Sequence, residues 1–202
     1  MSVRWGVACT DALGTWGSTP EERADAYPCD TLVERPDIVV FRAVDVAAPA
    51  ATMFRWLCQL RVAPYSYDWI DNFGRRSPRE LIDGLEHLEV GQTVATIFRL
   101  VSFEPDRSIT LDSTTSLFGR VVITYRVAPV DPDRCRLVAK VLCLTPRNPV
   151  GVVMRWILPA GDLLMMRRQL LTLRDLAEQT GREGYASPRT SPLTMEHESG
   201  EK

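Results

Sequence analysis

The residues best suited to chemistry in this sequence lie in one short segment, Tyr65–Trp69, which reads YSYDW. Aromatic faces contact apolar molecules, while phenol and carboxylate tips orient a polar group. Burial in a dry cavity raises the pKa of a carboxyl group toward neutrality, which makes Asp68 and Tyr67 the candidates for acid–base catalysis. The alternative is structural: the rings anchor a short helix on the body of the protein, and Asp68 caps that helix.

Further residues are predicted to line the same cavity from neighbouring elements. Trp56 lies one predicted helix before the segment. Arg99 stands among apolar residues of a predicted strand, where it either meets a ligand carboxylate at the cavity edge or is a solvated or ion-paired arginine at the strand end. The full set of candidate ligand-binding residues is Trp56, Tyr65, Tyr67, Trp69, Phe98, Arg99, Tyr125 and Met166.

Other cations are predicted to lie outside the cavity. Arg126 and Lys140 alternate with apolar residues in two predicted strands, which favours a solvated position for both side chains. A small basic patch is formed by Arg75, Arg76 and Arg79. We expect this patch to be a solvated loop, with an anion site as the alternative.

The scarcity of some residue types narrows the chemistry. The only lysines are Lys140 and Lys202, and the only histidines are His87 and His197. A Schiff-base mechanism needs a lysine and a catalytic triad needs a histidine, so few residues could serve either mechanism. The five cysteines include no C-x-x-C pair, which favours reduced core thiols over a metal site or a disulfide framework. No Walker A, H-E-x-x-H or dinucleotide glycine motif occurs. We therefore expect no metal and no cofactor.

Charge and hydropathy argue against two classes of partner. The formal net charge is −2 and the pI is near 5.8, which disfavours nucleic-acid binding. The most apolar stretch, 149–166, is interrupted by Arg155 and Asp162, so we expect no membrane-spanning segment. Reduced cysteines indicate a cytoplasmic protein. The excess of Arg over Lys is typical of a bacterium with a GC-rich genome.

The first half of the chain predicts one strand followed by short helices. Ile38–Val46 is a largely apolar, strand-like run. Pro49 opens a helix over Ala50–Leu60, whose apolar residues recur at helical spacing. Two shorter helices are expected over Tyr67–Phe73 and Pro78–Leu85.

The second half predicts a sheet and then a long helix. From Thr93 to Leu144 the hydrophobic period is two, which predicts four antiparallel strands joined as hairpins. After Pro149 the period becomes helical, and Pro159 is expected to restart the helix. A helix of about twenty residues ending at Gly181 is then predicted by the apolar stripe Leu163, Met166, Leu170, Leu173 and Ala177.

Three regions follow from these patterns. Residues 1–36 are predicted to form an arm that packs on the body through its aromatic side chains. Residues 37–180 form the predicted ligand-binding domain. Residues 181–202 are rich in Ser, Pro, Glu and Thr, which predicts a disordered tail.

The order of these elements resembles the START-like superfamily, also called Bet v 1-like or SRPBCC. The resemblance rests on three runs: FRAVDVAAP at 41–49, YSYDWIDN at 65–72 and LEVGQ at 88–92. The second run points to the bacterial polyketide cyclase/dehydrase-like branch. The resemblance implies an α+β helix-grip fold, in which a curved antiparallel β-sheet wraps around a long C-terminal helix and two short helices follow the first strand.

The expected function is binding of a hydrophobic or amphipathic small molecule, such as a lipid, polyketide or aromatic metabolite, in a cavity between the sheet and the last helix. One alternative is an enzyme of cyclase, aromatase or dehydratase type that uses the same cavity. Another is a partner-binding module without a ligand, which a space filled by bulky side chains would favour.

Overall fold

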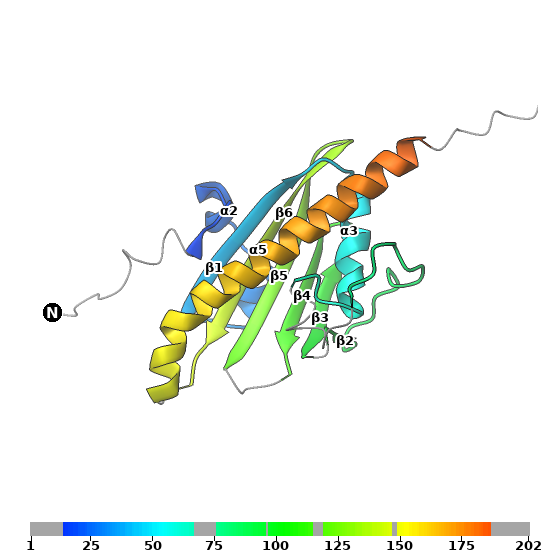
Figure 1. Cartoon of the computed structure of the whole chain (residues 1–202). Helices are drawn as coiled ribbons and strands as arrows, with labels where there is room; N and C mark the ends of the chain where they lie inside the picture. Colours follow the sequence, from blue (N-terminus) through cyan, green and yellow to red (C-terminus); the bar gives the residue numbers. More distant parts are fainter. Residues whose placement is uncertain (1–13, 67–75, 96, 115–118, 147–148, 187–202) are drawn as a thin grey trace, which may run out of the picture.

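One face of an antiparallel β-sheet is crossed diagonally by a single long helix (Figure 1). The computed structural model describes residues 14–66, 76–95, 97–114, 119–146 and 149–186. In these residues the strands form one sheet in the order β1-β6-β5-β4-β3-β2, so the first strand pairs with the last. This α+β arrangement is the helix-grip fold that the order of elements predicts.

The strands form a meander, and β1 pairs with its last member. β1 spans Ile38–Val46 and pairs with β6, Arg134–Leu144. Along β5 the predicted alternation holds: Tyr125 packs toward the long helix, whereas Val122 packs on the opposite face. The remaining strands are β2 Thr93–Val94, β3 Phe98–Glu104, β4 Ser108–Ser113 and β5 Arg120–Asp131.

One predicted strand is divided in two. The alternation after Thr93 predicts a single strand, but Ala95 has a φ of 45° and turns the chain between β2 and β3. The two pieces consequently pair with each other. A left-handed residue other than glycine costs about 1–2 kcal/mol. The Ala95 N–H donates to the Leu60 carbonyl at 3.1 Å, which holds the turn in place.

The long helix α5 runs without a break over Pro149–Ala186. This corrects two predictions, a restart at Pro159 and an end at Gly181. A proline inside a helix removes one hydrogen bond, and it can kink the helix without ending it. The 38 residues of α5 correspond to a length of about 57 Å. The described buried positions follow the predicted stripe and comprise Met166, Gln169, Leu170, Leu173, Leu176 and Ala177.

Helix α3 lies beside α5 at one end of the sheet (Figure 1). It spans Ala50–Cys58, begins after Pro49 as predicted, and continues as a 3-10 turn over Gln59–Arg61. Trp56 of α3 donates from Nε1 to Thr180 Oγ1 of α5 at 3.1 Å. The two helices are therefore joined by a side-chain hydrogen bond as well as by apolar packing.

The loop after α3 contains less helix than predicted. The segment Pro78–Leu85 forms turns, which corrects the prediction of a helix there. Gln59 accounts for the difference, because its amide donates to the Ile82 carbonyl and accepts from the Ile82 N–H, both at 3.3 Å. In a helix over Pro78–Leu85 the Ile82 N–H would instead donate to the Pro78 carbonyl. The helix predicted over Tyr67–Phe73 lies outside the described residues.

The segment before β1 covers the face of the sheet opposite α5. It contains α2, Pro20–Ala24, and a 3-10 turn, Pro28–Thr31. The Cys29 N–H donates to Thr124 Oγ1 in the sheet at 3.1 Å. The apolar cluster buried under this segment comprises Tyr27, Cys29, Val33, Phe41, Ala43, Val122, Val138 and Leu142.

Cations on this face of the sheet pair with acids of the covering segment. Lys140 Nζ lies 2.6 Å from Asp30 Oδ1, and Arg126 Nη2 lies 2.7 Å from Asp25 Oδ2. Lys140 is only 8% exposed, which corrects the prediction that it lies in solvent. Alternation puts both cations on the correct face, but a strand pattern carries no information about a distant segment that covers that face.

None of the helices in the described part of the chain combines the length and the hydropathy that a bilayer span requires. The division into an arm (1–36), a body (37–180) and a tail (181–202) stays a prediction, because residues 1–13 and 187–202 lie outside the described residues.

The pair formed by Glu22 and Arg136 predicts a pH dependence of stability. Their Oε1 and Nε atoms lie 2.7 Å apart. Burial by itself raises the pKa of Glu22, but hydrogen bonds from Arg136 and from the Thr19 main-chain N–H hold that pKa below its ordinary value of 4.5. A carboxylate of lowered pKa stabilises the fold above its ordinary pKa, and this contribution is lost as the pH falls through the lowered pKa.

We therefore expect Glu22→Gln to reduce the free energy of unfolding by about 1 kcal/mol at neutral pH. The reduction should shrink progressively below pH 4.5. Urea unfolding followed by circular dichroism at several pH values measures this difference, with the exposed Glu34→Gln as control. A reduction that is equally large at about pH 3 would contradict the assignment.

Candidate ligand-binding site

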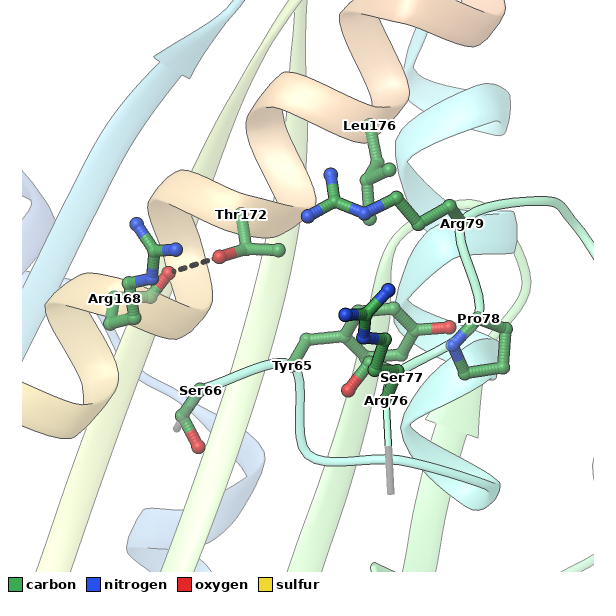
Figure 2. A pocket seen from close by; sticks show the side chains of 9 residues that line it. All are labelled: Tyr65, Ser66, Arg76, Ser77, Pro78, Arg79, Arg168, Thr172 and Leu176. Atoms are coloured by element: carbon green, nitrogen blue, oxygen red, sulfur yellow. Dashed lines mark hydrogen bonds between the residues drawn. The ribbon is translucent and has the colours of Figure 1, made fainter. Parts of the chain in front are cut away.

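A pocket of about 340 Å³ lies between α5 and the loop that follows α3. Figure 2 shows α5 on one side of it and the loop on the other. The lining combines apolar surface with hydroxyl and guanidinium groups. Its described residues are Tyr65, Ser66, Arg76, Ser77, Pro78, Arg79, Arg168, Thr172 and Leu176.

α5 forms one wall through residues four positions apart. Arg168, Thr172 and Leu176 lie on one side of the helix because a helical turn contains 3.6 residues. Leu176 is buried, whereas Arg168 is exposed. Thr172 Oγ1 donates to the Arg168 carbonyl at 2.8 Å. The hydroxyl proton of Thr172 is therefore directed at the helix and not into the pocket.

Gln169 holds the loop wall to α5 and to the sheet. Its Nε2 donates to the Pro64 carbonyl at 2.6 Å, and its Oε1 accepts from the Tyr125 hydroxyl at 2.6 Å. Gln169 is 9% exposed, and breaking a hydrogen bond at a buried position is costly because a partner is left unsatisfied. The amide thereby positions Tyr65 and Ser66, which directly follow Pro64.

Tyr65 joins the loop to the core. Its φ of 56° lies in the left-handed region, which glycine adopts at no steric cost and a tyrosine does not. Its side chain is buried, and its ring packs edge-to-face on Trp56 with 6.0 Å between ring centroids. Such aromatic pairs contribute about 0.5–1.5 kcal/mol beyond area burial, which is comparable with the backbone strain.

The structure brings part of the predicted ligand-binding set together. Tyr65 lines the pocket, and Trp56 contacts Tyr65 from α3. Tyr67, Asp68 and Trp69, which include both catalytic candidates, lie outside the described residues. Their roles stay predictions.

Three further predicted residues belong to the core between α5 and the sheet. Tyr125 and Met166 are buried there, with 3.6 Å between the hydroxyl oxygen and the thioether sulfur. Phe98 packs at the border of the same core. These three residues contribute no part of the described pocket lining. Tyr125 acts on the site through Gln169.

Arg99 lies on the other face of the sheet. It is the strand partner of Asp112, which is the strand partner of Val122, and directly opposed residues share a face. Val122 packs under the segment before β1, so Arg99 is directed away from α5. A register shift between Leu100 and Ser102 separates Arg99 from the apolar residues farther along β3 that favoured an inward position.

Arg168 is a pocket residue that the sequence does not predict. For Arg76 and Arg79 the sequence predicts a solvated loop, with an anion site as the alternative. The structure places all three on one pocket. Helical spacing relates Arg168 to Thr172 and Leu176, but no local signal relates α5 to a loop far away in the sequence.

The described cysteines are free thiols buried in the core. They are Cys29, Cys58, Cys135 and Cys143. Burial raises the pKa of Cys58 to about 12 and that of Cys135 to about 11, so both stay protonated at neutral pH. Within the described residues, no group of three or more His, Cys, Asp or Glu side chains is arranged to hold a metal ion.

Comparisons with known proteins concern the architecture. No family model matches the sequence, and no curated protein matches it significantly. Among solved structures, the Zhui aromatase/cyclase from Streptomyces sp. R1128 is similar at 19% identity and a TM-score of 0.43, over 74% of this chain and 96% of that chain.

Two further structures are similar at the same level. A hypothetical protein from Helicobacter pylori has 16% identity and a TM-score of 0.49, over 75% of this chain and 95% of its own. Protein MLL2253 from Mesorhizobium loti has 14% identity and a TM-score of 0.46, over 70% of this chain and 98% of its own. These likenesses concern the architecture alone.

The role of Gln169 predicts a specific loss of stability. We expect Gln169→Leu to lower the free energy of unfolding by about 2 kcal/mol, because the half-buried Pro64 carbonyl loses its donor and the buried Tyr125 hydroxyl loses its acceptor. Gln179→Leu, on the exposed side of the same helix, should change it by less than about 0.5 kcal/mol. Denaturant unfolding of both variants measures the difference. Small and equal effects would show that the Gln169 amide does not hold the loop.

Burial of the thiols predicts their reactivity. A Cys9→Ser variant retains only the four buried cysteines. We expect this variant to show no fast-reacting thiol at neutral pH while folded, because burial limits access and keeps the thiols protonated. Unfolding in guanidinium should expose all four. Titration with an aromatic disulfide reagent measures both states, and rapid labelling of the folded variant would refute the expectation.

Proposed function

We propose that this chain binds an amphipathic small molecule in the pocket between α5 and the loop after α3. The proposal rests on the volume and the lining of this pocket. Its volume of about 340 Å³ falls within the range of small-molecule sites, about 300–1,000 Å³. A lining of mixed polarity is typical of sites that bury one part of a ligand and orient the other.

The polarity of the lining changes from the inner end of the pocket to its mouth. Tyr65 and Leu176 are buried, at 1% and 4% exposure, and supply apolar surface at the inner end. Arg76 and Arg79 are exposed and lie at the mouth. A ligand with an apolar body and one polar end fits this gradient, because its body leaves water while its polar end remains solvated.

The proposed position lies on the flank of α5, not beneath it. Leu170 and Leu173 are fully buried between α5 and the sheet, and Tyr125 contacts Met166 there. These side chains fill the part of the predicted cavity that lies under the described side chains of α5. A filled interior alone would favour a partner-binding module, whereas a pocket of ligand size on the flank favours a small molecule.

The described lining favours binding over catalysis. It contains no carboxylate, imidazole or amine, which are the groups that acid–base and Schiff-base mechanisms use. Asp68 and Tyr67 remain the candidates for a cyclase-type reaction and lie outside the described residues.

Blocking the pocket should abolish ligand uptake. We expect the full chain to bind the neutral dye Nile red with a gain in fluorescence, and Thr172→Trp to reduce that gain at least tenfold, because the indole occupies the pocket. Gln179→Trp adds the same side chain to α5 outside the pocket and should leave uptake unchanged. Fluorescence titration measures all three proteins. Absence of uptake by the unmodified chain, or equal uptake by both variants, would overturn the proposed site.

A further inference from the structure

We propose that the ligand of this pocket carries an anionic group, a carboxylate or a phosphate, which the guanidinium groups of Arg76, Arg79 and Arg168 bind. This inference rests on the proposed function, because it names the chemical class of the molecule that occupies the same pocket.

Two segments far apart in the sequence bring these positive charges together. Arg76 and Arg79 come from the loop and Arg168 comes from α5, yet all three line one pocket. Figure 2 shows the Arg79 side chain reaching from the loop toward Thr172 and Leu176 on the helix. Like charges gathered on one pocket repel one another, and an anion bound among them removes that repulsion.

No described acidic residue neutralises these arginines. None of the three forms an ion pair within the part of the chain that the structure describes, and the neighbouring Glu80 pairs with none of them. Arginines elsewhere in the fold do have such partners, as Arg120 has in Asp112 at 2.7 Å. The pocket therefore holds positive charge that is available to a ligand.

The composition of the lining also favours an anion. No Asp or Glu occurs among its described residues, although the chain as a whole has 26 acidic and 24 basic side chains. A guanidinium presents a planar fork of N–H donors that matches two oxygens of a carboxylate or phosphate. The Thr172 hydroxyl donates its proton to the Arg168 carbonyl, so that proton is not available to a ligand. The charged donors of the described lining are the guanidinium groups.

The apolar inner end and the basic mouth together define the ligand. Tyr65 and Leu176 contact its apolar body. The guanidinium groups bind its acidic end, which lies near solvent. We infer an aromatic or aliphatic molecule that ends in a carboxylate or phosphate, and we expect a neutral molecule of the same shape to bind more weakly.

Three probes that share one ring system test this inference: 2-naphthoate, 2-naphthyl phosphate and the neutral 2-naphthol. Isothermal titration calorimetry on the full chain should show both anions binding about tenfold tighter than 2-naphthol. Their advantage should decline as salt is raised, since screening weakens exposed charge pairs. The tighter of the two anions identifies which acidic group the mouth prefers.

Matched variants assign the effect to the pocket. Arg79→Gln and Arg168→Gln should each weaken 2-naphthoate binding about fivefold or more and leave 2-naphthol binding unchanged. Arg182→Gln removes the same charge from an exposed position of α5 outside the pocket and should change neither affinity. Circular dichroism and Tm confirm that each variant is folded.

The outcomes separate this inference from the proposed function. Equal affinities for the anions and 2-naphthol, or equal losses in Arg79→Gln and Arg182→Gln, would overturn the anion assignment and leave the pocket as a ligand site. Uptake of Nile red without binding of either anion would also overturn the anion assignment. Failure of Nile red and all three naphthyl probes to bind would overturn the proposed function itself.

Discussion

The two hydrogen bonds of the Gln169 amide connect the three parts of the protein that build the pocket. Gln169 belongs to α5, Tyr125 to the sheet and Pro64 to the loop, and both bonds measure 2.6 Å. The Pro64 carbonyl can only accept, so the NH₂ end of the amide must face the loop and the oxygen must face the sheet. Together with the apolar stripe that packs on the sheet, these two bonds set the rotation of α5 about its axis. Because Arg168 precedes Gln169, the same rotation places its side chain on the pocket side of the helix.

The sheet is covered on both faces by different kinds of interaction. On one face the apolar stripe of α5 packs on the strands. On the other, Lys140 and Arg126 lie 5.0 Å and 4.2 Å from the centre of the Tyr27 ring, and each also pairs with an acid of the covering segment. Burial raises the pKa of Tyr27 to about 12, so the phenol stays neutral. These charge-balanced contacts stabilise the face of the sheet opposite the one on which α5 packs.

Sequence periodicity predicts the elements well and their ends poorly. The alternation along β5 and the stripe of α5 are both confirmed. The continuation of α5 past Gly181 and the turns over Pro78–Leu85 are not predicted. For the segment Pro78–Leu85 the reason is the Gln59 side chain, whose amide forms hydrogen bonds with the main chain of Ile82, 23 residues later in the sequence. Local propensity is overridden wherever a distant side chain supplies the partners of the backbone.

The sequence by itself determines the fold class and the chemical inventory of this protein. Hydrophobic period is a local consequence of helix and strand geometry, and the scarcity of Lys and His is a matter of composition. The tertiary structure alone decides where charge collects. It buries Lys140 under a distant segment, directs Arg99 away from α5, and brings Arg168 to the pocket of Arg76 and Arg79. Such convergence depends on loop paths and strand register between remote positions, which no local pattern encodes.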